Sequence, residues 1–236
     1  MKIGVKTFND PAFLRHFEKD ADFFEIMAIE GKDYSFLSEF SKPIIIHAQH
    51  HKFGINNSDK TKHQKNSNSI KFARDLANKN QSTKIIVHPG ELIDNNCSLQ
   101  ESLSFINSLN DSRTLIENMP HPQKYLCSTP EQMAEYIKET GLGFCFDINH
   151  AISAALVVEK DPYSFIEGFV NLKPSHYHLC GHKIKDKDIT HLNFVDSEID
   201  LKKIFSMLPK DAEITLEIPN DVEKTEKDIE MIRSFI

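Results

Sequence analysis

The sequence predicts an α/β protein in which residues 1–236 form a single domain, a (β/α)8 TIM barrel. Short apolar segments alternate with amphipathic helical segments along the whole chain, and eight such pairs can be counted. This alternation implies a parallel sheet, and eight units suggest that the sheet closes into a barrel. A length of 236 residues fits one barrel and leaves nothing over for a second domain.

The expected strands are short apolar runs bounded by polar residues, glycine or proline. In chain order they cover residues 2–8, 23–28, 43–48, 84–90, 114–120, 143–151, 175–180 and 213–219. The third is rich in β-branched isoleucine, which favours strands. Pro89 and Gly90 stop the fourth. In the sixth, the apolar run ends at Asp147, and a buried carboxylate is costly unless it is paired or binds a metal.

The expected helices follow the strands and carry apolar residues at helical spacing. They cover residues 11–19, 34–41, 67–80, 99–109, 130–141, 162–170, 201–208 and 222–236. Thr129 is the expected N-cap of the fifth, with Pro130 at its first position, and Asp161 is the expected cap of the sixth. Residues 50–65 are polar and read as a long loop. We expect a solvated lid there, with a phosphate-binding or DNA-facing loop as the alternative.

The charge balance argues against a dedicated nucleic-acid binder. There are 35 acidic and 28 basic residues, a net charge of −7, whereas phosphate neutralisation favours a basic face. The four cysteines form no CxxC pair, and Cys145 and Cys180 fall inside expected strands, so we expect reduced cysteines and a cytoplasmic protein. Neither a signal peptide nor a membrane-spanning run is evident, and we expect no membrane partner. No pattern indicates an oligomeric state.

Histidines and carboxylates recur at the carboxyl ends of the expected strands. They are His47, His88, Glu117, Asp147, His178 and Glu217. In a TIM barrel the strand ends converge at one rim, so residues remote in sequence become neighbours there. Each residue alone has a simpler interpretation as a surface group, a core histidine or a rim salt bridge. Six of eight strand ends with this chemistry are improbable for a purely structural rim.

The last four of these residues predict a divalent-metal site. Glu117, Asp147 and Glu217 repel one another when gathered, unless some are protonated or a cation lies between them. Three carboxylates and the His178 imidazole suit Mn²⁺, Mg²⁺, Co²⁺ or Zn²⁺. Further nitrogen ligands are available from three more histidines: His88, His150 and His191.

The motifs around these residues resemble the xylose isomerase-like TIM barrel superfamily, which includes sugar phosphate isomerases and epimerases and endonuclease IV. Six segments carry the resemblance in the right order: 86–90 (IVHPG), 115–118 (LIEN), 146–151 (FDINHA), 177–179 (YHL), 190–192 (THL) and 216–218 (LEI). No single segment is specific, but together they run over nearly the whole chain.

The isomerase and epimerase branch implies that a Glu, an Asp, a His and a second Glu hold one ion, here Glu117, Asp147, His178 and Glu217. The resemblance implies that Glu117 and Glu217 shuttle protons at adjacent carbons of a small sugar or sugar phosphate, through a metal-stabilised enediolate. It also implies that His150 contacts the substrate.

The endonuclease IV branch implies three zinc ions held by nine residues. Seven positions fit: His88, Glu117, Asp147, His150, His178, His191 and Glu217. The loop histidine expected after the third strand lacks a counterpart, since His50 and His51 lie too early. The aspartate expected two residues before His191 is replaced by Ile189, with Asp188 one step out of register. Residues 195–197 (VDS) stand where Gly-Glu-Gly is usual.

We therefore expect an isomerase or epimerase acting on a small carbohydrate. The alternative is a metal-dependent phosphodiesterase acting on abasic DNA, and nucleic acid is a partner only under that alternative. A third interpretation is a barrel that binds a ligand without turning it over. His47, His88 and Glu25 are the candidate substrate contacts, although Glu25 could equally form a structural salt bridge. His47 could instead be a metal ligand or a core histidine.

Overall fold

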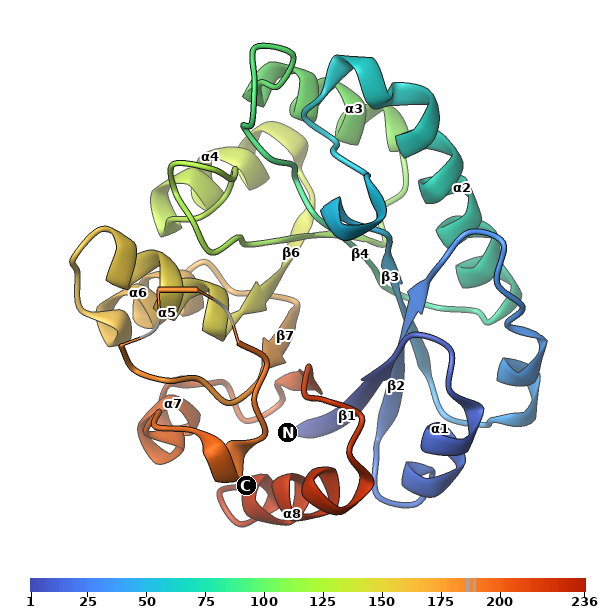
Figure 1. Ribbon diagram of the computed structural model, residues 1–236, viewed down its shortest axis with the longest axis vertical. Coiled ribbons are helices and arrows are strands. Elements are labelled where there is room, and N and C mark those ends of the chain that lie inside the picture. The colour runs from blue at the N-terminus through green and yellow to red at the C-terminus, as the bar shows by residue number, and fades with distance from the viewer. Residues whose placement is uncertain (186, 189) are drawn as a thin grey trace.

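The computed structural model describes residues 1–185, 187–188 and 190–236. Within these residues, eight parallel strands pair in chain order, and β8 pairs with β1 to close the barrel. Figure 1 looks down the barrel, with the strands around the centre and the helices outside them. The predicted (β/α)8 TIM barrel is therefore confirmed.

The strands are short and almost entirely buried. They are β1 Lys2–Thr7, β2 Phe23–Ala28, β3 Ile44–Ala48, β4 Ile85–Val87, β5 Thr114–Glu117, β6 Gly143–Asp147, β7 His176–Leu179 and β8 Glu213–Leu216. Helices cover their outer face, and side chains from alternate positions fill the inside. One interior cluster is formed by Phe23, Ile45, Ile86, Leu115 and Cys145. It is the apolar floor on which the site rests.

All the α-helices of the described residues except α2 begin at a side-chain cap. They are α1 Pro11–Phe17, α2 His63–Lys79, α3 Leu99–Leu109, α4 Pro130–Thr140, α5 Ile148–Val157, α6 Pro162–Val170, α7 Leu201–Met207 and α8 Val222–Arg233. Short 3-10 helices are η1 Ser35–Glu39, η2 His51–Phe53, η3 Lys60–Lys62 and η4 Phe194–Asp196. The predicted caps are confirmed, because Thr129 accepts the amide hydrogen of Gln132 and Asp161 that of Ser164.

One helix prediction and one strand prediction are wrong. Residues 34–41 do not form an α-helix, since only the 3-10 turn η1 lies there, tied down by the Tyr34 hydroxyl, which donates to the Met27 carbonyl at 2.6 Å. Conversely, the stretch expected as strand to residue 151 leaves the sheet at Asp147 and continues as α5. Most of α5 is buried against the barrel and α6, so its sequence lacks the alternating polar face that marks a surface helix.

The prediction of a solvated lid over residues 50–65 is also wrong. Asn56 and Ser58 are buried, and Asn56 Oδ1 accepts the backbone amide of Glu91 at 2.8 Å, in the loop after β4. Asn66 in turn donates to the Asn56 carbonyl at 2.6 Å. Gly90 has φ +129°, and a Cβ there would lie 2.6 Å from the Ser58 nitrogen. The segment is thus clamped to its neighbour by side-chain hydrogen bonds.

Within the described residues the cysteines are free: Cys97, Cys127, Cys145 and Cys180. Cys145 and Cys180 are buried in the strand region, as expected. Among those same residues, no helix combines the length and the apolar character that crossing a membrane requires.

Candidate metal centre and active site

The carboxyl-terminal mouth of the barrel is lined by ionisable residues that all eight strands supply. Strand pleating places them one layer above the apolar floor, so that, for example, Leu115 is followed two positions later by Glu117, and Cys145 by Asp147. In strand order the set is Lys6, Glu25, His47, His88, Glu117, Asp147, His178 and Glu217.

Four of these residues form a compact group, the Glu117 cluster, defined as Glu117, Asp147, His178 and Glu217. One ligand atom from each lies within 4.8 Å of the others, so the structure brings together the four residues expected to share an ion. Nδ1 of His178 lies 3.3 Å from Glu117 Oε1 and 3.1 Å from Glu217 Oε1. Three carboxylates and one imidazole at this separation form a donor set for a divalent cation.

Two asparagines hold the strand ends that carry this cluster. The side-chain amide of Asn118 donates to the Asp147 carbonyl at 2.9 Å, and its oxygen accepts the Asp147 amide at 2.7 Å. Asn149 makes the same pair of bonds with Cys180, both at 2.8 Å. These clamps join β5 to β6 and β6 to the end of β7. They belong to motifs seen in the sequence, but their role depends on tertiary contacts.

Glu25 and Lys6 lie beside the Glu117 cluster and contact two of its members. Glu25 is fully buried within β2, and its Oε2 lies 3.0 Å from His178 Nε2 and accepts the Thr215 hydroxyl at 2.7 Å. Protein groups surround Glu25 and it does not line the cavity, so its placement favours the salt-bridge alternative over a substrate contact. Lys6 supplies that salt bridge, since its Nζ lies 3.0 Å from Glu25 Oε1. Sequence analysis missed Lys6, which also bonds Glu217.

Glu25 fixes the orientation of the His178 ring. Glu25 accepts a hydrogen bond from Nε2, so Nδ1 is the nitrogen that faces the cluster. Burial opposes ionisation of His178, but Cys145 and the surrounding carboxylates hold its pKa well above the usual value, so Nδ1 would present a lone pair once a bound cation replaces its proton. A carboxylate behind a metal-binding histidine commonly fixes its tautomer in this way.

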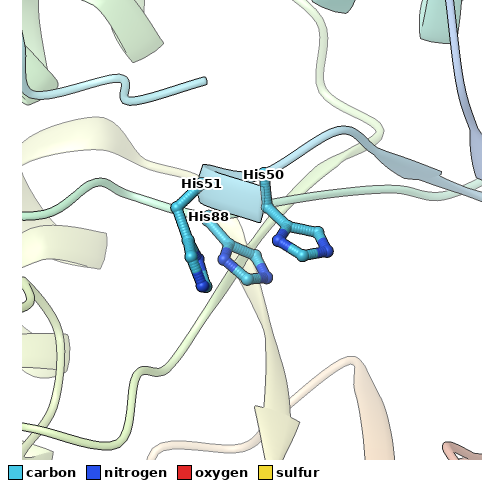
Figure 2. Close-up of side chains that lie close together, drawn as sticks. All are labelled: His50, His51 and His88. Carbon is cyan, nitrogen blue, oxygen red and sulfur yellow. The ribbon is translucent and has the colours of Figure 1, made fainter. Parts of the chain in front are cut away.

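A second set of histidines lies on one side of the Glu117 cluster. Figure 2 shows the rings of His50, His51 and His88 side by side, and one nitrogen of each lies within 4.8 Å of the others. The rings of His50 and His88 stack with centroids 4.9 Å apart. His50 and His51 come from the clamped segment after β3. Contrary to the expectation that they lie too early in the chain, they reach the loop that follows β4.

His47 and His88 connect this set to Glu117. Nε2 of each lies 3.0 Å from Glu117 Oε2, and His47 Nδ1 donates to the Ala48 carbonyl at 2.7 Å. The bare Nε2 of His47 therefore faces a carboxylate oxygen, an arrangement that a shared proton or metal ion stabilises. Nδ1 of His51 and Nδ1 of His88 are buried and, among the described residues, have no hydrogen-bond partner.

His150 and His191 lie at the edge of the site, and the structure brings neither into a metal-binding group of the described residues. His150 Nδ1 donates to the Asn118 carbonyl at 2.6 Å, and His191 Nδ1 to the Glu217 carbonyl at 3.0 Å. Asp188 is exposed and lies 3.8 Å from His121. Ile189 is outside the described residues.

Residues 195–197, which stand where Gly-Glu-Gly is usual, lie at the end of η4 and its C-cap. Asp196 pairs with Lys224 at 2.9 Å on the surface.

Electrostatics at the mouth reflect an excess of buried carboxylates. Burial alone raises the pKa of Glu217, but Lys6 and then His178 outweigh it and lower that pKa to about 2. Burial likewise opposes ionisation of Glu117, yet the imidazoles of His88 and His178 hold its pKa well below the usual range. Asp147 caps α5, with Oδ1 accepting the His150 amide at 2.8 Å and Oδ2 lying 3.5 Å from His150 Nε2. Burial raises the pKa of Asp147, and Glu217 and Glu117 add to that increase despite the opposing effect of His150.

The histidines of the second set are neutral at pH 7. Burial lowers the pKa of His88 to about 4, against the opposing attraction of Glu117. Burial, followed by repulsion from His88, also lowers the pKa of His50. Neutral imidazole is the form that binds metal ions.

A cavity of about 340 Å³ opens above the site. Glu117 and Glu217 line it, whereas Asp147 and His178 lie below its surface. Its apolar wall includes Phe8 and Pro219. The remaining lining residues are Lys6, Met27, His47, His50, His51, Lys52, His88, His150, His191, Ile218 and Asn220. A volume of this size suits a small molecule.

Residues 35–235 match the family model described as xylose isomerase-like TIM barrel. The uncharacterized protein MJ1311 of Methanocaldococcus jannaschii is 27% identical over 172 residues, which cover 66% of this chain and 57% of that protein. The match thus spans little more than half the length of this relative.

Solved structures share the fold over 100% of this chain. A D-tagatose 3-epimerase-like protein has a TM-score of 0.76 at 21% identity, covering 97% of that chain. Endonuclease IV from Thermus thermophilus has a TM-score of 0.75 at 14% identity, covering 98%. The IOLI protein with a bound zinc atom has a TM-score of 0.70 at 17% identity, covering 96%.

Proposed function

The chain belongs to the xylose isomerase-like TIM barrel family, and on that premise we propose that it is a divalent-metal-dependent isomerase or epimerase of a small sugar or sugar phosphate. The observation that carries this proposal is the Glu117 cluster, which lies directly under a cavity of small-molecule size. A structural neighbour named for tagatose epimerisation is consistent with it, although that likeness by itself concerns the fold.

The residues of the Glu117 cluster fit a divalent ion. Burial raises the pKa of Asp147, and repulsion from Glu217 and Glu117 adds to the increase, so a bound cation would favour ionisation of Asp147 beside them. His178 presents Nδ1 to the same point. Oxygen-rich ligands with one nitrogen suit Mn²⁺, Mg²⁺, Co²⁺ or Zn²⁺, and zinc is present in the IOLI structure.

The chain's own residues supply the proton transfers. When bound, the ion would polarise adjacent carbonyl and hydroxyl oxygens of the sugar and acidify the carbon-bound proton. Glu117 and Glu217 both line the cavity and are the groups that would remove and return that proton at neighbouring carbons. His150 also lines the cavity, with Nδ1 fixed by Asn118 and Nε2 3.5 Å from Asp147 Oδ2, and its ring is the group that would contact a substrate hydroxyl. The wall around Phe8 and Pro219 would limit access of water.

A second candidate function is phosphodiester hydrolysis of abasic DNA, and one observation favours it. The groups His47, His88 and Glu117, and His50, His51 and His88, could hold another ion beside the first, with Glu117 shared between the two sites. Paired ions can activate water and stabilise the leaving oxygen. The orphaned Nδ1 atoms of His51 and His88 fit such an ion. His150 and His191, however, do not converge on a third site within the part of the chain that the structure describes.

Metal analysis combined with two activity assays tests the proposal. The protein is purified without chelators, its metal content is measured by mass spectrometry, and it is assayed with a panel of ketoses, aldoses and their phosphates and with an abasic-site duplex. We expect one equivalent of Mn²⁺, Mg²⁺, Co²⁺ or Zn²⁺ and exchange of solvent deuterium into a sugar carbon. Two or three zinc ions with duplex cleavage and no sugar exchange would replace the isomerase by the hydrolase.

We also propose that residues 1–236 act as one domain and that the protein is cytoplasmic. The free cysteines of the described chain support this location, since disulfides are rare there.

A further inference from the structure

Lys6 is the one lysine among the eight ionisable residues that the strands supply to the mouth. It lies near the carboxyl end of β1, and its side chain is only 10% exposed. Nζ lies 3.0 Å from Glu25 Oε1 and also bonds Glu217 Oε1. Because β1 is adjacent to both β2 and β8 in the closed sheet, the ammonium lies between carboxylates from its two neighbouring strands.

The groups around Lys6 are also arranged as ligands. One ligand atom each of Glu25, His47, His178 and Glu217 lies within 4.8 Å of the others, and this group is distinct from the Glu117 cluster. Two of its members are the partners of Lys6. Oε1 of Glu25 is buried and accepts no hydrogen bond from the described residues, so the nearby ammonium is what compensates its charge.

We propose that the Lys6 ammonium is a built-in cation that occupies a latent second divalent-metal site formed by Glu25, His47, His178 and Glu217. Two carboxylates and two imidazoles are a common ligand set for Zn²⁺ or Mn²⁺. The Lys6 ammonium neutralises the two carboxylates, and because it is covalently attached to the chain it cannot exchange with metal ions in solution. Lys6 is therefore a positioning residue: it holds Glu217 directly, and it holds the His178 ring through Glu25.

This inference rests on the metal site of the proposed function. The role given to Lys6 is to exclude a second ion next to the one that the Glu117 cluster would bind. An ion at the Lys6 position would share Glu217 and His178 with that cluster, and His178 would bridge the two ions only after losing the hydrogen on Nε2. With Lys6 in place, Oε1 of Glu217, the oxygen that faces His178, is engaged by the ammonium, which keeps a second ion away from it. The histidines His50, His51 and His88 lie outside this arrangement and are the same in every variant compared below.

The test is the metal content of Lys6 variants relative to the wild-type protein. Lys6→Ala removes both the charge and the volume of the side chain, so we expect it to bind one more equivalent of Zn²⁺ or Mn²⁺ than the wild type, measured by equilibrium dialysis and mass spectrometry. Lys6→Arg keeps the charge and should keep the wild-type stoichiometry. Lys6→Met keeps the volume without the charge and should gain no ion. The double variant Lys6→Ala with Glu25→Gln should lose most of the gain.

Folding of the variants is itself informative. Without its cation the site holds unbalanced carboxylates, so Lys6→Ala should melt at a lower temperature in chelator and recover when Zn²⁺ or Mn²⁺ is added, whereas Lys6→Arg should not respond more than the wild type. Lys6→Ser is a second variant with the same expected gain. Failure of both small variants to fold with the ion present would overturn the inference, as would an unchanged metal content.

The two proposals fail in distinguishable ways. A wild-type protein that binds no divalent ion contradicts the proposed function. A wild-type protein that binds its ion, but whose Lys6→Ala variant gains none, contradicts only the role of Lys6. A gain that persists after Glu25→Gln would place the extra ion elsewhere and also overturns the inference.

Discussion

The two ends of the barrel both carry ionic clusters, but their charges balance differently. At the amino-terminal end, Lys2 and Lys84 lie 2.9 Å and 2.5 Å from the two oxygens of Glu213, and Lys84 also donates to the Ser175 carbonyl. At the mouth, four carboxylates and several histidines face one lysine, Lys6. Cavities of about 310 Å³ and 340 Å³ lie at the two ends, so cavity volume does not distinguish them.

The difference supports placing the proposed active site at the mouth. A cluster whose charges compensate one another can stabilise the fold without an added proton or cation. A buried cluster with an excess of carboxylates is costly unless a proton or cation completes it. The set around Glu213 therefore fits a structural role, and the excess of carboxylates in the Glu117 cluster supports the proposal that this cluster binds a cation.

The strongest test replaces one glutamate at each end of β8. Glu217→Gln should lower turnover of the substrate at least about 10³-fold, because both a proton-transfer group and a metal ligand are altered. Glu213→Gln should leave turnover within about twofold, since it is a structural group at the far end. Steady-state kinetics measure both, with circular dichroism as the check on folding. Equal losses in the two variants would erase the distinction between the ends.

Removal of the metal ion from the Glu117 cluster should lower the stability of the fold. Chelation should lower the melting temperature, because an ion present at 100 times its Kd adds about 2.7 kcal/mol of stability. For a chain of this size that corresponds to roughly 5–10 °C in a scanning calorimeter. In Asp147→Asn the carboxylate excess is smaller, so the shift should shrink. A wild-type melting temperature that does not respond to chelator would contradict a bound ion.

A smaller effect is expected from the asparagine that clamps β5 to β6. Asn118→Ala leaves the Asp147 amide and carbonyl without their buried partners, at a cost of about 1–3 kcal/mol. Because it also frees a metal ligand, affinity should fall about 10–100-fold, measured by calorimetric titration. Asn193→Ala is the matched control, since that buried asparagine bonds Asp228 away from the mouth. It should lose stability while retaining metal affinity.

The smallest effect is expected at the amino-terminal end. Burial raises the pKa of Glu213, but Lys2 and Lys84 outweigh it and lower the pKa from 4.5 to about 2. A lowered carboxyl pKa adds stability above pH 4.5 that is lost as the pH falls toward 2. Lys84→Met should therefore cost less than about 1 kcal/mol at pH 7. Urea unfolding at pH 7 and pH 3 should give a smaller difference at the lower pH.

Much of the fold and part of the site could be predicted because their signals are local. Strand and helix alternation identifies the barrel. The pleat of a strand places Glu117 on the same face as Leu115, two residues earlier, independently of the neighbouring strands. The same local logic failed for α5, because a helix buried almost all round has no polar face to reveal its period. It also failed for residues 50–65, whose asparagines look like solvated loop residues but bond buried partners.

The sequence by itself determined that histidines and carboxylates stand at the strand ends, and that a closed barrel would gather them. Only the tertiary structure decided which groups meet. Lys6 and Glu217 are 211 positions apart and become partners because closure places β1 beside β8. His50 and His51 meet His88 because the Asn56 contacts fold their segment onto the loop after β4. Alternation along a strand is fixed by local backbone geometry, whereas contacts between strands and loops depend on how the whole chain packs.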